Sequence, residues 1–247
     1  MSEDFGSLRM MMIGVAQPDQ VLWRQTTALA SVMIELAVHD PLTAAQALAT
    51  TGEDVCVMDA TLSDDQKTAV VAAARATQPS TLIFISGPKN TSRPKGVDGI
   101  LGKPKSVEEA RKVVEICIRA KFPTRVMLVD DSGTMRSIVR KILSASNFTL
   151  DIHEAPEGMA ALEQLRSSNF GVVFVDYNMP GLNGFDMLAQ IRRETSNVAV
   201  VMMSSTQEHG VADRARAAGA FAFLKKPFYP ADIDTILERY YGLHLPL

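Results

Sequence analysis

Two series of apolar segments, one in each half of the chain, follow the same order. The second half contains RVMLVDD, GVVFVD, VAVVMMSS and FAFLKKP, at 125–131, 171–176, 198–205 and 221–227. The first half contains LRMMMIGV, DVCVMD, STLIFISG and DGILGKP, at 8–15, 54–59, 80–87 and 98–104. A repeat of about half the chain is too long for a solenoid unit and has the size of a duplicated domain. The sequence therefore predicts two domains of one fold.

Patterns typical of helices lie between the apolar runs. Thr134 to Ser144 carries apolar residues at spacings of three and four, as expected for a helix that packs on one side. Strands that are apolar at every position and alternate with helices indicate a parallel sheet covered on both faces. We therefore expect an α/β protein with two five-stranded parallel sheets. The predicted domains are 1–121 and 122–247, divided just before Pro123.

The composition favours an ordinary globular protein of the reducing cytoplasm. Of 247 residues, 47% are hydrophobic and 21% charged, and the formal net charge of −3 gives no basic field for nucleic acid. Cys56 and Cys117 lie in apolar segments, which favours two buried, reduced thiols. The N-terminus is acidic, unlike a signal peptide, and the apolar run from Leu29 to Val38 is too short to cross a membrane. We expect no membrane attachment.

Polar residues follow the predicted strands of the second half. Because the carboxyl ends of parallel strands form one rim, these residues should converge. They are Asp130, Asp131, Asp176, Ser204 and Lys226. Three crowded carboxylates resist ionisation unless a cation is present, which predicts a Mg²⁺ site that Mn²⁺ could also fill. A lysine and a hydroxyl suit phosphoryl oxygens, so the rim predicts phosphoryl transfer to a carboxylate.

The second half resembles the receiver domain of two-component response regulators. The resemblance covers 124–247 and rests on VDD, FVDYNMPGLNG, MMSS and KKPF, in that order. It implies a flavodoxin-like (βα)5 fold, and Asp176 as the residue that accepts phosphate from a histidine kinase or histidine phosphotransferase. It also implies Mg²⁺ held by Asp130, Asp131, Asp176 and the main-chain carbonyl of Asn178. Ser204 and Lys226 would hold the phosphoryl group.

Two further residues of this half have alternative interpretations. The resemblance implies that Phe223 is a switch that reports phosphorylation, although an aromatic residue in a strand is more often part of the core. His209 could be taken for a phosphorelay histidine. It lies in a predicted loop, which favours an ordinary surface histidine.

A phosphohydrolase of the haloacid dehalogenase type is a rival hypothesis, since such enzymes also use an aspartyl phosphate and Mg²⁺. Their motif has a second aspartate two positions after the first. LVDDSGT has Asp130 and Thr134 but Ser132 between them, so the acid/base aspartate is missing. This departure disfavours the phosphohydrolase.

The first half departs from the family pattern at the metal. Alignment on the second half places Gly14 and Val15 where Asp130 and Asp131 stand. The next acidic residue is Asp19, beyond Pro18, so we expect no replacement carboxylate. Counterparts of the other three residues are present, as Asp59, Ser86 and Lys103. We therefore expect a degenerate domain in which Lys103 pairs with Asp59 and no phosphoryl group is accepted.

The segment from Ser86 to Lys103 is also shortened. It spans 17 positions, against 22 from Ser204 to Lys226, and contains Pro88 and Pro94. We expect the fourth helix to be shortened or replaced by a loop. The segment carries Lys89, Arg93 and Lys95 against Asp98, which is typical of a solvated loop and also fits an acidic docking partner.

The remaining expectations concern output. A helix is predicted from Gln20 to Val38 with Trp23 among many apolar residues, and a homodimer through this domain is one hypothesis besides core packing. After the last predicted helix, GLHLPL leaves no room for a DNA-binding or enzymatic domain. We therefore expect a response regulator that acts through a downstream protein partner, without nucleic acid or membrane. The alternative is a phosphorelay intermediate or phosphate sink.

Overall fold

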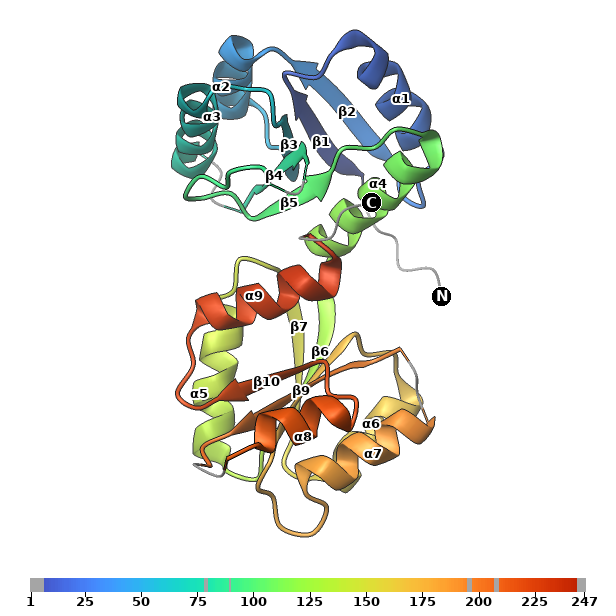
Figure 1. The fold of residues 1–247 in the computed structure, drawn as a ribbon, viewed down its shortest axis with the longest axis vertical. Coiled ribbons are helices and arrows are strands. Elements are labelled where there is room, and N and C mark those ends of the chain that lie inside the picture. Colours follow the sequence, from blue (N-terminus) through green and yellow to red (C-terminus); the bar gives the residue numbers. More distant parts are fainter. Residues whose placement is uncertain (1–6, 78–79, 89, 195–196, 207–208, 244–247) are drawn as a thin grey trace. The chain divides into compact units, whose positions relative to one another are not determined.

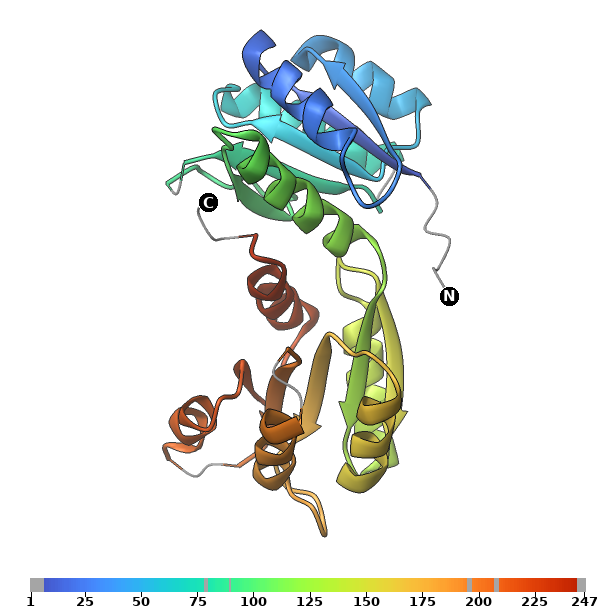
Figure 2. The same ribbon diagram turned by 90° about the vertical axis from the view of Figure 1, so that its right-hand side faces the viewer.

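The chain forms two compact units, each built around one sheet (Figure 1). The computed structural model describes residues 7–77, 80–88, 90–194, 197–206 and 209–243. The first unit comprises 1–122 with 238–247, and the second comprises 123–237. Helices and strands alternate along the chain in both units, except that β5 follows β4 with no described helix between them (Figures 1 and 2).

The first unit has a five-stranded parallel sheet in the order β2-β1-β3-β4-β5. Its strands are β1 (Leu8–Ile13), β2 (Ile34–His39), β3 (Val55–Asp59), β4 (Leu82–Gly87) and β5 (Gly99–Gly102). Its helices are α1 (Gln17–Thr27), α2 (Pro41–Thr50), α3 (Asp64–Thr77) and α4 (Val107–Lys121). Two pairs of helices pack together, α1 with α4 and α2 with α3.

The second unit has the order β10-β9-β8-β6-β7, again with every strand parallel. Its strands are β6 (Thr124–Val129), β7 (Leu150–Ala155), β8 (Val172–Asp176), β9 (Ala199–Ser204) and β10 (Ala222–Lys225). Its helices are α5 (Gly133–Ser144), α6 (Gly158–Ser167), α7 (Gly184–Glu194), α8 (Val211–Ala217) and α9 (Pro230–Tyr241), the last of which extends past residue 237. The predicted α/β class and the two parallel sheets are confirmed.

Apolar strands and capped helices explain these elements. β3, β4, β8 and β9 are buried along their whole length, because helices cover both faces of each sheet. α2 begins at Pro41 after Asp40, whose carboxylate accepts from the main-chain N–H groups of Leu42 and Thr43. Side chains from both β8 and β9 enter the core of the second unit, for example Val173, Val175, Val200 and Met202.

Two local expectations for the first unit are corrected. The predicted helix from Gln20 to Val38 is two elements, since α1 ends at Thr27 and Ile34–His39 is the edge strand β2, paired residue by residue with β1. An apolar stretch that is both short and uninterrupted suits either structure, and here pairing with β1 decides it. Trp23 lies in α1 and is 3% exposed, so it belongs to the core.

The connection from β4 to β5 contains no helix among its described residues, as the shortened segment predicted. Asp98 is buried in this connection, where it accepts from the main-chain N–H of Ile83 at 2.7 Å and pairs with Arg75 at 2.5 Å. Arg93 Nε donates to the carbonyl of Val97 at 2.8 Å. The connection is therefore anchored and is not simply a solvated loop, while Lys89 lies outside the described residues.

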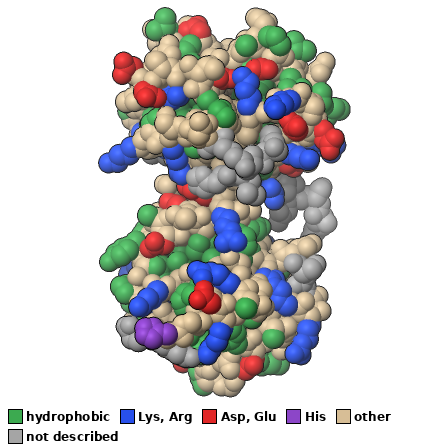
Figure 3. Space-filling model, in the orientation of Figure 1, with side chains coloured by type: hydrophobic (Ala, Val, Ile, Leu, Met, Phe, Trp, Pro, Cys, Tyr) green, Lys and Arg blue, Asp and Glu red, His purple; other side chains and the backbone are tan. Residues whose placement is uncertain are grey.

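The surface and the thiols agree with the composition. On the face drawn in Figure 3, Lys and Arg side chains are interspersed with Asp and Glu in both units. Cys56 and Cys117 are free and buried, and burial raises the pKa of both thiols, that of Cys117 to about 12. The expectation of buried, reduced thiols is confirmed. None of the helices in the described part of the chain has the length and apolar character needed to span a bilayer.

Candidate functional site

The carboxyl ends of the second sheet gather most of the predicted site residues. Asp176 is the last residue of β8 and Ser204 the last of β9, while Asp130 directly follows β6 and Lys226 directly follows β10. Strand register aligns them: Val129 is opposite Val175, Asp176 is opposite Met203, and Ser204 is opposite Lys225. Parallel strands therefore place four chemically active side chains on one rim.

Lys226 joins two carboxylates at this rim. Its Nζ donates to Oδ2 of Asp130 at 2.7 Å and to Oδ1 of Asp176 at 2.6 Å. The side chains of Lys226 and Asp176 are each 11% exposed and that of Asp130 is 3% exposed. In such a setting a charged side chain needs a partner, and here each carboxylate has the same one.

The other oxygen of each carboxylate accepts from the main chain two residues later. Oδ1 of Asp130 accepts from the N–H of Ser132 at 3.0 Å, and Oδ2 of Asp176 accepts from the N–H of Asn178 at 2.8 Å. Ser132 was not singled out in the sequence as part of the site. It also caps α5, because its hydroxyl accepts from the N–H of Met135. An aspartate two positions before a capping serine could have indicated this turn.

Burial governs the ionisation of Asp176. Removal from water raises the pKa of this carboxyl above its ordinary value of 3.8, the Lys226 ammonium offsets part of the rise, and the neighbouring Asp130 adds to it. Burial alone would lower the pKa of Lys226, but its bonds to Asp130 and Asp176 outweigh burial, so the pKa is raised. Two carboxylates therefore share the Lys226 ammonium as their ion-pair partner.

Asp131 does not join this buried group. Its side chain is exposed, because consecutive residues after a strand point in different directions. Within the part of the chain that the structure describes, no three His, Cys, Asp or Glu side chains come close enough to hold a metal ion. The three-carboxylate cluster expected from the sequence is here a pair, Asp130 and Asp176, with Lys226 between them.

The donor set nonetheless fits a hard divalent cation. The two buried carboxylates converge on one ammonium group, which shows that positive charge is stabilised at that point. All the available donors are oxygens, as Mg²⁺ prefers. The contributions of Asp131 and of the Asn178 carbonyl to a metal site stay predictions.

Ser204 ends β9, next to β8, and Phe223 lies on the neighbouring edge strand β10. Ser204 is 1% exposed and its Oγ accepts from the N–H of Thr206 at 3.0 Å, while its carbonyl accepts from the N–H of Lys226. Phe223 lies on β10, is half-buried and packs against the core of the second unit. Its role as a switch stays a prediction. His209 is exposed and lies outside any helix, as expected of a surface histidine.

The first unit repeats part of this arrangement. Nζ of Lys103 donates to Oδ2 of Asp59 at 2.9 Å, so the predicted pairing of these two residues is present. Asp59 is the last residue of β3, and Ser86 is opposite it on β4. Thr61 donates to Oδ1 of Asp59 twice, from its main-chain N–H at 2.9 Å and from its hydroxyl at 2.7 Å. Both oxygens of Asp59 are therefore engaged within the domain.

One expectation about the first unit is wrong. We expected no carboxylate in place of the missing counterparts of Asp130 and Asp131, yet Asp19 lies 3.0 Å from Nζ of Lys103. Asp19 was set aside in the sequence because it lies beyond Pro18, but α1 already starts at Gln17, and Asp19 in its first turn reaches Lys103. Lys103 thus bridges Asp19 and Asp59, as Lys226 bridges Asp130 and Asp176.

The position of Asp130 itself has no room for a side chain in the first unit. Gly14 follows β1 as Asp130 follows β6, and it has a φ of 72°, in the left-handed region that favours glycine. A Cβ added to Gly14 would overlap the side chain of Leu62, which is 9% exposed. Leu62 therefore occupies the space beside Gly14, where the side chain of a counterpart to Asp130 would lie.

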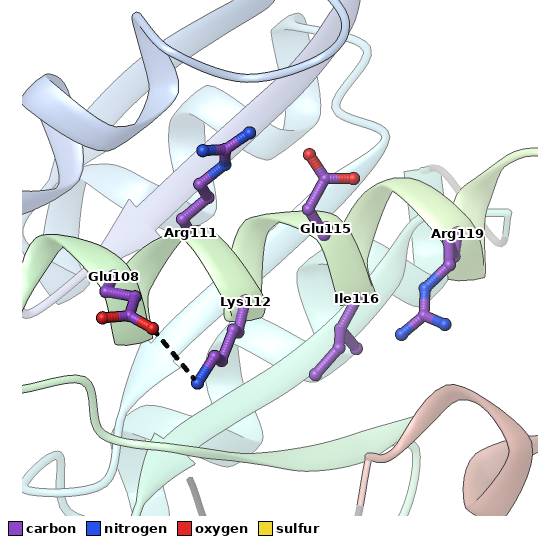
Figure 4. Close-up of a pocket in the computed structure, with 6 residues that line it drawn as sticks. All are labelled: Glu108, Arg111, Lys112, Glu115, Ile116 and Arg119. Atoms are coloured by element: carbon purple, nitrogen blue, oxygen red, sulfur yellow. Dashed lines mark ion pairs between the residues drawn. The ribbon is translucent and has the colours of Figure 1, made fainter.

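A further depression lies away from these sites. It has a volume of about 310 Å³ and follows the surface of α4, where the ion pair between Glu108 and Lys112 is also found (Figure 4). Its lining residues are Glu108, Arg111, Lys112, Glu115, Ile116 and Arg119. None of them is among the predicted site residues.

Comparisons with known proteins agree with the geometry of the second unit. A family model for the response regulator receiver domain matches residues 126–238. The chemotaxis protein CheY-3 of Vibrio cholerae is 35% identical over 121 residues, which are 47% of this chain and 92% of that protein. The chemotaxis protein CheY of Pseudomonas aeruginosa is 33% identical over 124 residues, or 48% of this chain and 99% of that protein.

Two solved structures match nearly the whole chain. Each is described as a two-component system response regulator/GGDEF domain protein. One is 22% identical with a TM-score of 0.50 and covers 94% of this chain and 99% of its own. The other is 20% identical with a TM-score of 0.51 and covers 96% of this chain and 99% of its own. At these identities the likeness shows the fold, and it includes both sheets. With the family model and the curated relatives, it follows that the chain belongs to the response regulator receiver family, whose members are signalling proteins of two-component systems.

Proposed function

We propose that the second domain, 122–247, accepts a phosphoryl group on Asp176 in a Mg²⁺-dependent reaction, and that the first domain, 1–121, is a degenerate receiver. The observation that carries the proposal is the bridge from Lys226 to both Asp130 and Asp176. This bridge supports the proposal, because it joins a buried carboxylate that would act as the nucleophile, a second carboxylate and a cation in one hydrogen-bonded group.

The reaction would use these side chains in separate roles. An oxygen of Asp176 forms a bond to phosphorus, while the bond from phosphorus to the nitrogen or oxygen of the donor breaks and the leaving group takes the electron pair. Lys226 and the hydroxyl of Ser204 then donate to the phosphoryl oxygens. Asp130, Asp131 and the Asn178 carbonyl would hold Mg²⁺, which, when bound, offsets the charge of the phosphoryl group.

The partners follow from the same proposal. The donor would be a sensor histidine kinase or a histidine phosphotransferase, and the output a change in contacts with a downstream protein or a second copy of the chain. The first domain would bind another protein and not accept phosphate. Thr61 and Lys103 bond to the carboxylate of Asp59, and Leu62 fills the space beside Gly14, where a metal-binding aspartate would lie. A phosphorelay intermediate or phosphate sink is the second candidate, since transfer to Asp176 is common to both.

The test is incubation with Mg²⁺ and acetyl phosphate, followed by intact mass measurement. Wild type and Asp59→Asn are expected to gain one phosphoryl group, and Asp176→Asn none. Labelling that persists in Asp176→Asn and disappears in Asp59→Asn would show that the phosphoacceptor has been misplaced. Steady release of phosphate from a panel of phosphate esters would favour the phosphohydrolase instead.

Lifetime and oligomeric state separate the two outputs. A phosphorylated form that persists and either binds a protein partner or changes its light-scattering mass supports the adaptor. Rapid loss of the group to water, or to a histidine phosphotransferase, supports the sink or the relay. A chain that stays monomeric with and without acetyl phosphate would remove the homodimer from consideration.

A further inference from the structure

Arg136, on α5, contacts the main chain of Asp130 and Asp131, which together are called the acid pair. Its Nη1 donates to the carbonyl of Asp130 at 2.7 Å and lies 3.4 Å from the carbonyl of Asp131. The side chain is 19% exposed. These carbonyls belong to the turn between β6 and α5, so the guanidinium links the first turns of the helix to the residues that follow the strand.

Glu154 on β7 holds Arg136 from the other side. Its Oε2 lies 3.4 Å from Nε of Arg136, and its Oε1 lies 2.9 Å from Nη1 of Arg140. Glu154 directly precedes Ala155, whose carbonyl accepts from the N–H of Asp130. Two sets of hydrogen bonds therefore fix the turn at Asp130 and Asp131. One is the bond from the N–H of Asp130 to Ala155, and the other is formed by Arg136 with the two carbonyls.

The hydrogen bonds of Arg136 matter more than its charge. A guanidinium next to the acid pair would by itself repel a divalent cation, but Glu154 compensates its charge and the partial exposure screens the remainder. What remains is geometry, because one guanidinium nitrogen, Nη1, holds both carbonyls. Removing a group that fixes metal ligands commonly lowers metal affinity by about 10- to 100-fold.

We propose that Arg136 is a positioning residue, which presets the turn at Asp130 and Asp131 for a divalent cation. The proposal rests on the function proposed above, because it takes this acid pair as the metal site. It adds a residue that neither binds the metal nor touches the phosphoryl group. It predicts that the turn loses its preset geometry when the hydrogen bonds of Arg136 Nη1 to the two carbonyls are removed.

The test is calorimetric titration of the full chain with Mg²⁺ alone. Arg136→Gln is expected to weaken Mg²⁺ binding by about tenfold. Arg140→Gln is the matched control, because Arg140 shares Glu154 but donates to the carbonyl of Ile152 and not to the acid pair. It should bind Mg²⁺ within about twofold of wild type. Arg136→Lys keeps the charge but has a single nitrogen, which cannot replace both Nη1 at the two carbonyls and Nε at Glu154, so this variant should also bind Mg²⁺ weakly.

A second readout is the dependence of acetyl phosphate labelling on Mg²⁺ concentration. Arg136→Gln should need about ten times more Mg²⁺ for half-maximal rate and reach the wild-type rate at saturation, whereas general damage to the fold would lower the rate at saturation as well. Unchanged or tighter Mg²⁺ binding by Arg136→Gln, wild-type binding by Arg136→Lys, or no binding by wild type would each overturn the inference. Wild type that binds Mg²⁺ but is not labelled would overturn the proposed phosphoacceptor and leave the role of Arg136 standing.

Discussion

At the scale of single residues, Asp59 and Asp176 occupy the same place in the repeated fold but different environments. Both accept from a lysine, yet Asp59 also accepts the hydroxyl of Thr61, and Asp176 has a second carboxylate beside it. Burial would raise the pKa of Asp59, but the bonds from Thr61 and Lys103 outweigh it, so the pKa lies below 3.8. The pKa of Asp176 lies above 3.8. The surroundings therefore favour the ionised form of Asp59 and disfavour that of Asp176.

The lowered pKa makes Asp59 a stabilising residue. Because the folded state favours its ionised form, the stabilisation is present above the ordinary pKa of 3.8 and is lost as the pH falls through the folded pKa. Asp59→Asn should lower the free energy of unfolding of the first unit by about 1 kcal/mol at pH 7, and the difference should shrink below about pH 4.

Trp23 provides the measurement, because it is the only tryptophan and is buried in the first unit. Denaturant unfolding followed by its fluorescence therefore reports this unit. Asp65→Asn removes an exposed carboxylate of α3 and serves as the control. Equal effects of the two substitutions at pH 7 would show that Asp59 is not specially stabilised.

The raised pKa of Asp176 predicts that its substitution changes the free energy of unfolding in the opposite direction. The folded state disfavours the ionised form, so wild type loses stability as the pH rises above 3.8, and Asp176→Asn should recover it. We expect the second unit of this variant to be more stable by about 1 kcal/mol at pH 7. Amide hydrogen exchange of peptides from β8 and β9 measures this, and faster exchange in Asp176→Asn would contradict it.

At the scale of elements, the turn from β8 into α7 is built around a close approach at Gly184. Its N–H donates to the carbonyl of Tyr177 at 3.1 Å. A Cβ on Gly184 would lie 2.6 Å from the carbonyl oxygen of Asp176 and 3.0 Å from the Cα of Tyr177. Both contacts are with main chain, which cannot move aside as a side chain could. The first residue of α7 therefore sets the position of the strand end that carries Asp176.

Gly184→Ala should for this reason destabilise the second unit by about 2 kcal/mol and slow labelling by acetyl phosphate. Gly133→Ala is the matched control in the same unit. Gly133 begins α5, and the nearest atom to an added Cβ there is the end of the Arg136 side chain at 3.7 Å, so this helix should tolerate alanine. Thermal unfolding and the labelling rate test both variants, and equal tolerance at the two positions would refute the packing argument.

The elements also show how far sequence reasoning reaches. The repeat and the buried strands gave the fold class, and the strand ends gave Asp130, Asp176, Ser204 and Lys226. The helix predicted from Gln20 to Val38 failed because an apolar run alone does not distinguish a strand from a helix. Asp19 was considered and rejected, and Ser132 and Arg136 were missed. Each of the three reaches the site from a helix or turn, through contacts that strand alignment does not describe.

At the scale of the whole molecule, the two units share one fold but carry different side chains at the carboxyl ends of their strands. In the second unit, Asp130 and Asp176 share Lys226 as their partner, and all the donors are oxygens, which fits a hard divalent cation. In the first unit, Leu62 fills the space beside Gly14, and Thr61 and Lys103 occupy both oxygens of Asp59. The two units thus share one fold, and the residues at the carboxyl ends of their sheets differ.

This asymmetry predicts that a phosphoryl analogue stabilises only one of the units. Beryllofluoride with Mg²⁺ should bind at Asp176, and at a hundred times its dissociation constant it should raise the free energy of unfolding of the second unit by about 2.7 kcal/mol. Hydrogen exchange of β8 and β9 peptides should slow accordingly. The unfolding transition of Trp23 should stay within about 0.5 kcal/mol, because the first unit has Gly14 in the position of Asp130 and Leu62 fills the space beside it. Asp176→Asn is the control and should lose the effect on the second unit. A comparable shift of the Trp23 transition in wild type that survives in Asp176→Asn would mean that the first unit binds the analogue itself, and the assignment of chemistry to one half would fail.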